Sequence, residues 1–519
     1  MLPPYQNEPL LDFSLEANRK AMLEALAKVE SQLGGEYPLI IGGREVRTGR
    51  TFKSVNPSRI DQVVGVIHAA GPDEVNQAVE AAWAAFAKWR RVPPEERAAL
   101  FVRAANILRR RRFEFIAWEV LEVGKTWAEA DAEVAEAIDH LEFFAREIFR
   151  YAEPARLYPF PSELNEMVYI PLGVVACITP WNYPYGIGMG TTLGAIAAGN
   201  TAILKPAEDA SVLGTIYYRV MAEAGLPEGV LNIVTGFGEE AGDALVTHPK
   251  VNMIVFTGSK EVGTRIYERA ARLAPGQIWL KRVVTEMGGK NAAIVDLSAD
   301  IEYAVNEIAY AAYGYQGQKC SCTSRVIALE QNYDQVVEAL VERTRRVDIG
   351  PAKENRFMGP LINRDAFEKV SSYFEIGRQE GRLLIGGRRA SGGELDLGYY
   401  VEPTVYADVD PKARIAQEEI FGPVISVIKA RDFEHALEIA NGTEYGLTGS
   451  VFTLDPAHMA RAKEAFHVGN LYINRRSTGA WIGVHPFGGY NMSGTCVKLG
   501  GPDYLMAFLQ PKLITRRVR

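Results

Sequence analysis

Residues 174–208 read VVACITPWNYPYGIGMGTTLGAIAAGNTAILKPAE, and this stretch decides the fold. Two apolar runs rich in β-formers, Val174–Ile178 and Thr201–Leu204, flank a helical segment with glycine turns. The same rhythm continues through the runs Leu231–Val234, Met253–Thr257 and Ala292–Val295. Short strands that alternate with helices predict a parallel, doubly wound α/β sheet.

The rest of the chain predicts further units around this sheet. Residues 71–155 show helical spacing, and a second α/β pattern follows Tyr313, with a helix at 333–346 and strands at 325–329, 424–429 and 470–474. We expect a nucleotide-binding domain at 1–155 and 174–285, and a second α/β domain at 286–484. The segments 156–173 and 500–519 do not fit either rhythm. We expect them to form a small protruding β-hairpin that pairs with another subunit.

Composition excludes several classes of function. The net charge is −7, the pI is near 5.7, and the longest basic cluster is Arg109–Arg112, which argues against nucleic acid as a partner. No apolar run reaches the roughly 18–20 residues that span a bilayer, and the N-terminus lacks a signal-peptide pattern. We therefore expect a soluble cytoplasmic protein. The four cysteines have no Cys-x-x-Cys spacing, so neither disulfides nor a metal site are expected.

Two glycine-rich motifs carry the predicted chemistry. Glu286-Met-Gly-Gly-Lys290 precedes Gly317-Gln-Lys-Cys320 by a short stretch of chain. A cysteine thiolate adds to an electrophilic carbonyl, and a nearby carboxylate can activate water to release the thioester. The pair predicts oxidation of an aldehyde through a covalent intermediate. Cys322 is an alternative nucleophile, because residues i and i+2 of an extended segment share a face.

Asn182 lies in Pro180-Trp-Asn-Tyr-Pro184, a turn that two prolines make rigid. A fixed side-chain amide suits an oxyanion hole, in which the Cys320 backbone N–H would be the second donor. The alternative is that Asn182 only caps its own turn. Cys177 sits within an apolar run and is expected to be inert, and Cys496 is expected to be structural.

Cofactor contacts are predicted at the ends of strands. Gly258 and Ser259 begin a helix after a strand, where backbone N–H groups can hold a phosphate. Lys205 and Glu208 follow another strand, and the carboxylate would bind ribose hydroxyls and repel a 2′-phosphate, which favours NAD over NADP. Gly238 lies in a glycine-rich turn that ordinary turn chemistry also explains. Lys205 and Glu208 have the alternative of a surface ion pair.

Two further positions complete the predicted nicotinamide site. Gly288 follows Glu286 and would leave room for the nicotinamide ring and for movement of the Glu286 side chain. Glu419 stands in Glu418-Glu-Ile-Phe-Gly-Pro423, beside the aromatic Phe421. Its predicted role is to position the ribose and the ring, and the alternative is a solvated loop.

Seven motifs in one order resemble the NAD(P)-dependent aldehyde dehydrogenase superfamily: Pro180–Pro184, Lys205–Glu208, Phe256–Ser259, Glu286–Gly289, Gly317–Cys320, Glu419–Pro423 and Pro486–Gly489. The resemblance covers nearly the whole chain. It implies an α/β fold with a Rossmann-type NAD domain, a catalytic domain, an oligomerisation flap and a homodimer or larger assembly. It also implies that Cys320 is the nucleophile, Glu286 the general base and Asn182 the oxyanion donor. The cofactor contacts that it implies are Trp181, Lys205, Glu208, Gly238, Gly258, Ser259, Gly288, Glu419 and Phe421.

Within that superfamily, three segments resemble the L-glutamate γ-semialdehyde (pyrroline-5-carboxylate) dehydrogenases: Tyr5–Pro9, Ala274–Arg282 and Ser477–Gly483. By this resemblance, the amides of Gly479 and Ala480 and the side chain of Ser321 hold the substrate α-carboxylate, and Tyr183 and Phe487 pack on its aliphatic chain. Arg475 and Arg476 are alternative carboxylate partners.

The resemblance implies NAD-dependent oxidation of the semialdehyde to glutamate in proline catabolism, with a separate proline dehydrogenase as a possible partner. Three alternatives stay open from the residues themselves. The chain could oxidise another semialdehyde, could be a cysteine thioesterase or hydrolase, or could be a non-catalytic binding protein. The retained nucleophile and base argue against the last of these.

Overall fold

The computed structural model describes residues 2–518 and contains two seven-stranded sheets. The first sheet has the order β11 (Arg282–Glu286), β10 (Met253–Thr257), β7 (Val174–Thr179), β8 (Thr201–Pro206), β9 (Leu231–Ile233), β2 (Leu39–Ile41) and β3 (Arg44–Val46). The five strands from β11 to β9 are parallel, whereas β2 and β3 are antiparallel to their neighbours.

Helices cover both faces of this sheet, as the doubly wound prediction requires. Successive residues of β7 enter different cores: Val175 and Cys177 pack with α3 (Pro94–Arg110), α5 (Trp127–Glu147), α6 (Gly186–Ala197) and α7 (Ser211–Glu223). Val174 and Ala176 pack on the other face with α2 (Pro72–Trp89), α8 (Asp243–Thr247) and α9 (Lys260–Ala271). Burial on both faces explains why these strands read as continuous apolar runs.

The remaining N-terminal elements surround this unit. They are α1 (Glu16–Glu30), α4 (Arg112–Glu122) and a three-stranded sheet of β1 (Gly35–Tyr37), β5 (Arg59–His68) and β4 (Thr51–Asn56). The strand pattern before residue 71 was not predicted. A signal for one part of it exists, because Gly42 and Gly43, both with positive φ, form the two-residue turn between β2 and β3.

The second sheet has the order β14 (Arg382–Ile385), β15 (Thr404–Ala407), β16 (Val424–Ala430), β13 (Thr323–Leu329), β12 (Asn291–Val295), β18 (Thr448–Phe452) and β19 (Asn470–Ile473). Its helices are α10 (Ile301–Tyr313), α11 (Tyr333–Arg345), α12 (Arg364–Glu380), α13 (Arg414–Gln417), α14 (Phe433–Asn441) and α15 (Pro456–Ala465). The prediction that Ala292–Val295 continues the first sheet is wrong. This strand lies between β13 and β18, because the chain passes from one sheet to the other directly after Glu286.

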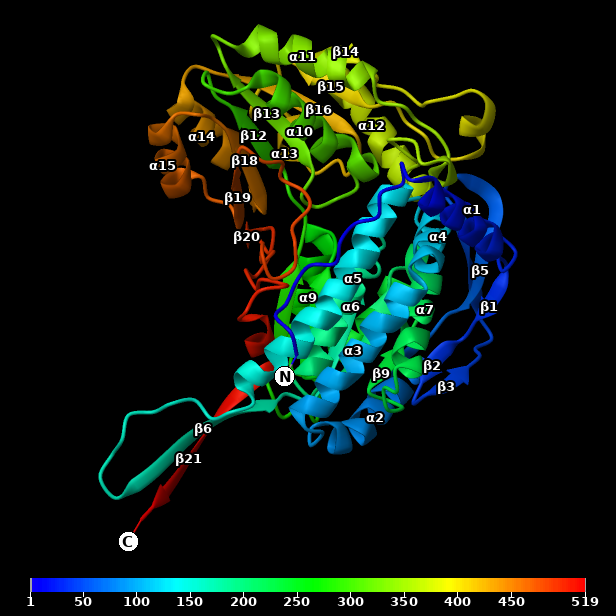
Figure 1. The fold of residues 1–519 in the computed structure, drawn as a ribbon, viewed down its shortest axis with the longest axis vertical. Helices are drawn as coiled ribbons and strands as arrows, with labels where there is room; N and C mark the ends of the chain where they lie inside the picture. The colour runs from blue at the N-terminus through cyan, green and yellow to red at the C-terminus, as the bar shows by residue number, and fades with distance from the viewer. Residues whose placement is uncertain (1, 519) are drawn as a thin grey trace.

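A two-stranded ribbon projects from the body of the molecule (Figure 1). It pairs β6 (Glu163–Pro171) with β21 (Leu509–Arg517) antiparallel along their whole lengths. Most side chains of β21 are exposed, and Leu513 is 63% exposed. A last short pair, β17 (Tyr445–Gly446) with β20 (Tyr490–Asn491), lies near the second sheet. No helix among residues 2–518 is long and apolar enough to cross a membrane.

Sheet order determines where the site forms. The chain visits β7, β8 and β9 in turn and then returns to place β10 on the other side of β7. At such a reversal the loops that follow the two neighbouring strands diverge and leave a crevice. Here these loops are Pro180–Pro184 after β7 and Gly258–Ser259 after β10, so two predicted motifs meet at one point.

Candidate active site

Cys320 sits in a turn between helix α10 and strand β13. The chain reaches it through Gly314–Gly317, in which Tyr315 and Gln316 have φ of 48° and 58°. Cys320 is partly buried and lines two adjoining cavities. Cys322 is 7% exposed and lines neither cavity, since residues 320 and 321 form a turn rather than an extended segment. The geometry therefore favours Cys320 as the nucleophile.

The other two cysteines lie away from these cavities. Cys177 is fully buried within β7, and burial raises the pKa of its thiol to about 12. Cys496 is exposed.

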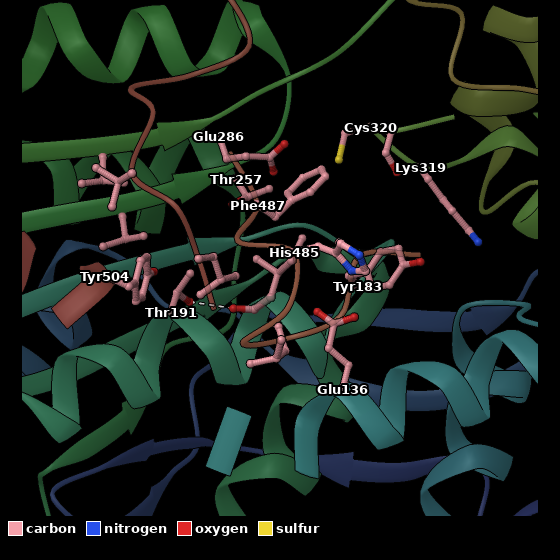
Figure 2. A pocket seen from close by; sticks show the side chains of 18 of the residues that line it. Glu136, Tyr183, Thr191, Thr257, Glu286, Lys319, Cys320, His485, Phe487 and Tyr504 are labelled. Atoms are coloured by element: carbon pink, nitrogen blue, oxygen red, sulfur yellow. Dashed lines mark hydrogen bonds between the residues drawn. The ribbon is translucent and has the colours of Figure 1, made fainter. Parts of the chain in front are cut away.

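Glu286, the last residue of β11, lies beside Cys320 in both cavities (Figure 2). Its Oε1 is buried and has no hydrogen-bond partner among residues 2–518. Burial raises the pKa of Glu286 to about 8; the Cys320 thiol works against this shift, and the charge of Glu419 adds to it. Burial and the Glu286 carboxylate together hold the pKa of Cys320 well above its usual range. A carboxyl group tuned close to neutral pH suits general base catalysis.

Asn182 is held across the site rather than within its own turn. Its Nδ2 donates to the backbone oxygen of Gln318 at 3.0 Å, so the alternative of a self-capping turn is wrong. An amide nitrogen carries two hydrogens, and one remains available. The backbone N–H of Cys320 donates to no acceptor among residues 2–518. Two donors are thus available beside the thiol, as an oxyanion hole requires.

A groove leads from Cys320 across the carboxyl edge of the first sheet. Trp181, Gly258 and Ser259 line both the cavity at Cys320 and the next cavity along the groove. Ser259 caps helix α9, with its Oγ accepting from the Val262 N–H at 3.3 Å, whereas the N–H groups of Ser259 and Lys260 have no acceptor among residues 2–518. Unpaired amides at the start of a helix are a site for a phosphate group.

The far end of this groove contains the other predicted nucleotide contacts, Lys205, Glu208 and Gly238. Lys205 Nζ lies 2.9 Å from Glu208 Oε1, and the same oxygen accepts the N–H of Gly238 at 2.9 Å. The ion pair is therefore part of the groove, and Gly238 belongs to it through its backbone.

Glu419 and Phe421 line the groove close to Cys320. Glu419 Oε1 accepts the N–H of Gly289 at 3.0 Å, and burial raises the pKa of this carboxyl. Glu419 is therefore not in a solvated loop. A Cβ at Gly288 would overlap the Glu419 carboxylate, so a side chain at this position would displace that carboxylate. Phe421 packs edge-on against Trp181 with ring centroids 5.5 Å apart.

The other cavity at Cys320, which is not part of the groove, is the substrate cavity. It contains all five predicted substrate contacts: Tyr183, Ser321, Gly479, Ala480 and Phe487. The N–H groups of Gly479 and Ala480 donate to no acceptor among residues 2–518, nor does the Ser321 hydroxyl. Gly479 has φ +73°, a conformation that favours glycine. Three unused donors thus face one cavity, an arrangement suited to a carboxylate.

The two arginines proposed as alternative carboxylate partners lie close to Gly479, and Arg475 donates to its backbone oxygen, but both make other contacts. Arg476 Nη1 lies 3.6 Å from Glu307, and its guanidinium lies over the Tyr310 ring at 4.0 Å. Arg475 donates to the backbone oxygen of Arg476 at 3.0 Å. Neither side chain lines the cavity.

Two charged residues and one histidine of this cavity were not assigned a role from the sequence: Glu136, Lys319 and His485 (Figure 2). Lys319 Nζ lies 2.5 Å from Glu129 of helix α5. Burial acts to lower the pKa of Lys319, but Glu129 together with Tyr310 and Cys322 outweighs this effect, so the pKa is raised and the lysine stays charged. Adjacency to Cys320 was the available signal for Lys319. Glu136 lies within the long helix α5, where nothing local marks it.

A buried charge cluster behind the site was also missed. Lys125 Nζ lies 4.1 Å from the Tyr183 ring centroid and 5.0 Å from that of Tyr315, and it pairs with Glu119 at 3.6 Å and with Glu133. Glu133 in turn accepts the N–H groups of Tyr185 and Gly186 at 2.7 and 2.8 Å. The cluster connects the turn that carries Asn182 to the segment that leads into Cys320.

Comparison with known proteins decides the family. Residues 45–514 match the model of the aldehyde dehydrogenase family. The chain belongs to the aldehyde dehydrogenase family. This membership agrees with the resemblance drawn from the seven motifs, and it disfavours the alternative of a cysteine hydrolase.

Relatives of this aldehyde dehydrogenase match over its whole length. It is 52% identical over 516 residues to a 1-pyrroline-5-carboxylate dehydrogenase of Geobacillus kaustophilus (strain HTA426), with 99% of each chain covered. A solved 1-pyrroline-5-carboxylate dehydrogenase from Thermus with bound NAD superposes with a TM-score of 0.98 at 50% identity, covering 99% of both chains. Proline utilization A from Bdellovibrio bacteriovorus superposes with a TM-score of 0.96 at 44% identity, and the match covers 99% of this chain but 53% of that one.

Proposed function

We propose that this aldehyde dehydrogenase oxidises L-glutamate γ-semialdehyde, the open form of pyrroline-5-carboxylate, to L-glutamate with NAD in proline catabolism. The observation that carries the proposal is the set of unused donors at Gly479, Ala480 and Ser321 in the cavity of Cys320. Relatives that share half of its residues over the full length are named for the same reaction.

Substrate recognition follows from the lining of the cavity. The α-carboxylate would accept hydrogen bonds from the Gly479 and Ala480 amides and from Ser321, and the aliphatic chain would lie between Tyr183 and Phe487. Glu136, whose side chain is 23% exposed, is the carboxylate available to the α-ammonium group.

The groove fits a dinucleotide. The unpaired amides at the start of α9 suit the pyrophosphate, Lys205 and Glu208 suit the adenosine ribose, and Glu419 suits the nicotinamide ribose. Glu208 disfavours a 2′-phosphate by charge repulsion, so NAD is preferred over NADP. When bound, NAD supplies the hydride acceptor, and its positively charged ring favours the Cys320 thiolate.

The residues at the junction of the two cavities perform the covalent chemistry. The Cys320 thiol passes its proton to Glu286, which releases it to solvent, and the sulfur bonds to the aldehyde carbon. Asn182 Nδ2 and the Cys320 N–H stabilise the negative oxygen that forms. After oxidation, Cys320 carries a γ-glutamyl thioester. Glu286 takes a proton from a water molecule that attacks this thioester, and the C–S bond breaks to release L-glutamate and restore the thiol.

The two sheets divide this work. The first sheet and its helices, residues 1–155 and 174–285, would bind the nucleotide, and residues 286–484 would form the catalytic domain. The ribbon of residues 156–173 and 500–519 would join subunits into a homodimer or larger assembly, because its long edges and exposed apolar side chains are otherwise uncovered. Light scattering of the intact protein and of a protein lacking residues 510–519 measures this contribution.

Two further features of the setting are part of the proposal. A proline dehydrogenase is the expected source of substrate, since one structural relative is a larger protein named for proline utilization. The cytoplasm is the expected location, because a catalytic thiol requires reducing surroundings.

A substrate panel tests the proposal. NADH formation would be followed by absorbance at about 340 nm, where only the reduced nucleotide absorbs. The substrates would be the glutamate, aminoadipate and succinate semialdehydes and betaine aldehyde, each at roughly the same concentration. We expect the highest kcat/KM for glutamate γ-semialdehyde and a lower value with NADP. A higher value for another aldehyde would contradict the proposed substrate.

A further inference from the structure

The N-terminal residues 2–13 form a strap, a segment without helix or strand that runs along helix α5 (Figure 1). Tyr5 Oη donates to the backbone oxygen of Ile482 at 3.0 Å, and Asn7 Nδ2 donates to the same oxygen at 3.0 Å. A Cβ at Gly483 would lie 2.9 Å from the Tyr5 ring, so the ring packs directly on the backbone there. The strap therefore contacts residues 482 and 483 through two hydrogen bonds and one close packing contact.

The strap is itself fixed to the helices beneath it. Asn7 Nδ2 donates to Asp139 Oδ2 at 2.7 Å, and the Glu8 N–H donates to Asp139 Oδ1 at 2.7 Å. Glu8 Oε2 also accepts from Arg109 at 2.9 Å, and the Leu11 N–H donates to Asp131 at 2.7 Å. These partners lie on α3 and α5, so the strap that contacts Ile482 is anchored to helices and not to another loop.

Residues 482 and 483 belong to the loop whose backbone N–H groups are proposed to bind the substrate. Residues 477–483 contain no helix or strand, and Gly479 and Gly483 have φ of +73° and +76°. Other contacts also hold this loop near its two ends: Ser477 Oγ donates to the Ser321 backbone oxygen at 2.7 Å, and the Gly483 N–H donates to the Gly500 oxygen at 2.9 Å. Ile482 lines the substrate cavity and follows Ala480 by two residues. An anchor at the Ile482 carbonyl thus restricts the peptide groups whose N–H bonds must converge on one carboxylate.

We infer that Tyr5 and Asn7 are positioning residues for substrate specificity: without touching the substrate, they hold the 477–483 loop so that its amides converge on the α-carboxylate. The inference rests on the proposed function. It also gives a physical reason for the pairing of an N-terminal motif with a loop more than 470 positions later in the chain.

Steady-state kinetics of Tyr5→Phe, Asn7→Ala and the double variant test the inference. Loss of binding that is equally strong in the ground state and the transition state raises KM and leaves kcat unchanged. Two lost hydrogen bonds correspond to roughly a tenfold rise in KM. We expect KM for glutamate γ-semialdehyde and the inhibition constant of L-glutamate to rise together by about tenfold in the double variant. We expect kcat and the KM for NAD to stay within about twofold.

Tyr400→Phe is the matched control, since its hydroxyl also bonds to a backbone carbonyl, that of Ser58 at 3.3 Å, far from the cavity. We expect it to leave both KM values unchanged. Tyr5→Phe retains the ring and removes only the hydroxyl, so it supplies the measurement should the double variant fail to fold. An unchanged KM for the semialdehyde, or an equal rise in the KM for NAD, would overturn the inference. The absence of semialdehyde turnover in the unaltered enzyme would instead contradict the proposed function.

Discussion

The two ends of the cleft are assembled in different ways. The nucleotide end takes most of its residues from the ends of neighbouring strands of one sheet: Trp181 after β7, Lys205 at the end of β8 and Gly258 after β10. The substrate end brings together parts of the chain that share no sheet: Glu136 from helix α5, Ser321 from the turn before β13 and Ala480 from a loop near the C-terminus.

Because of this difference, substitutions should affect the geometry of the two ends in different ways. Parallel strands fix their carboxyl ends relative to one another, so the nucleotide end is positioned by the sheet itself. The substrate end depends on long-range contacts such as Lys319 with Glu129 and Tyr5 with Ile482. We expect a substitution at one end to leave binding at the other end unchanged, except at the four residues that line both cavities: Ile187, Thr257, Glu286 and Cys320.

Cys320 and Glu286 are the shared residues with a proposed chemical role, and loss of the nucleophile has the largest expected effect. Cys320→Ala should lower kcat at least about 10³-fold, because the covalent intermediate cannot form. NAD binding, measured by fluorescence titration, should persist. Cys322→Ala is the matched control and should retain activity within a few-fold. Comparable losses in both variants would contradict the assignment of the nucleophile.

Glu286→Gln has the next largest effect. Removal of a general base lowers the rate by about 10²–10⁴-fold. Because a base works only when ionised and burial raises the pKa of Glu286 to about 8, activity of the unaltered enzyme should rise as the pH increases through this value. The variant should lose that rise in a pH–rate profile. A profile with the same rise near pH 8 in the variant would assign the ionisation to another group.

Ser321→Ala addresses the substrate end alone. The hydroxyl makes no hydrogen bond to residues 2–518, so its removal should leave the fold intact. Loss of one hydrogen bond to a charged group predicts roughly a tenfold rise in the KM for the semialdehyde. The KM for NAD, measured at saturating semialdehyde, should not change. A parallel rise in both constants would show that the two ends are not independent.

Glu208→Gln addresses the nucleotide end and has the smallest expected effect. The amide keeps the contact with the Gly238 N–H and removes the charge that disfavours a 2′-phosphate. We expect the ratio of kcat/KM for NAD to that for NADP to fall by about three- to tenfold, consistent with about one hydrogen bond or charge contact. The KM for the semialdehyde should be unaltered. An unchanged nucleotide ratio would remove Glu208 from the account of NAD preference.

The difference between the two ends also explains which site residues could be predicted from the sequence. Motifs of the nucleotide end are local: those of Lys205 and Gly258 lie at the ends of recognisable strands, and that of Glu419 lies just before one, so all three residues were predicted, and they line one groove. The error at Ala292–Val295 arose because a strand's period does not say which sheet it joins. The choice between Cys320 and Cys322 required the backbone turn at 320–321.

The substrate end was predictable only in part. Gly479, Ala480 and Ser321 came from resemblance to a family and not from spacing. Lys319 and its partner Glu129 are separated by 190 positions, and no local pattern connects them. The cluster of Lys125 with Glu119 and Glu133 is fully buried, whereas charged residues on a helix usually indicate a solvated face.

Trapping the acyl-enzyme tests the central claim most directly. Glu286→Gln mixed with NAD and glutamate γ-semialdehyde should release one equivalent of NADH per active site and then slow. Intact mass spectrometry followed by peptide mapping should locate one γ-glutamyl group on the peptide that contains Cys320. An unmodified Cys320 after NADH release, or an acyl group on any other residue, would contradict the account.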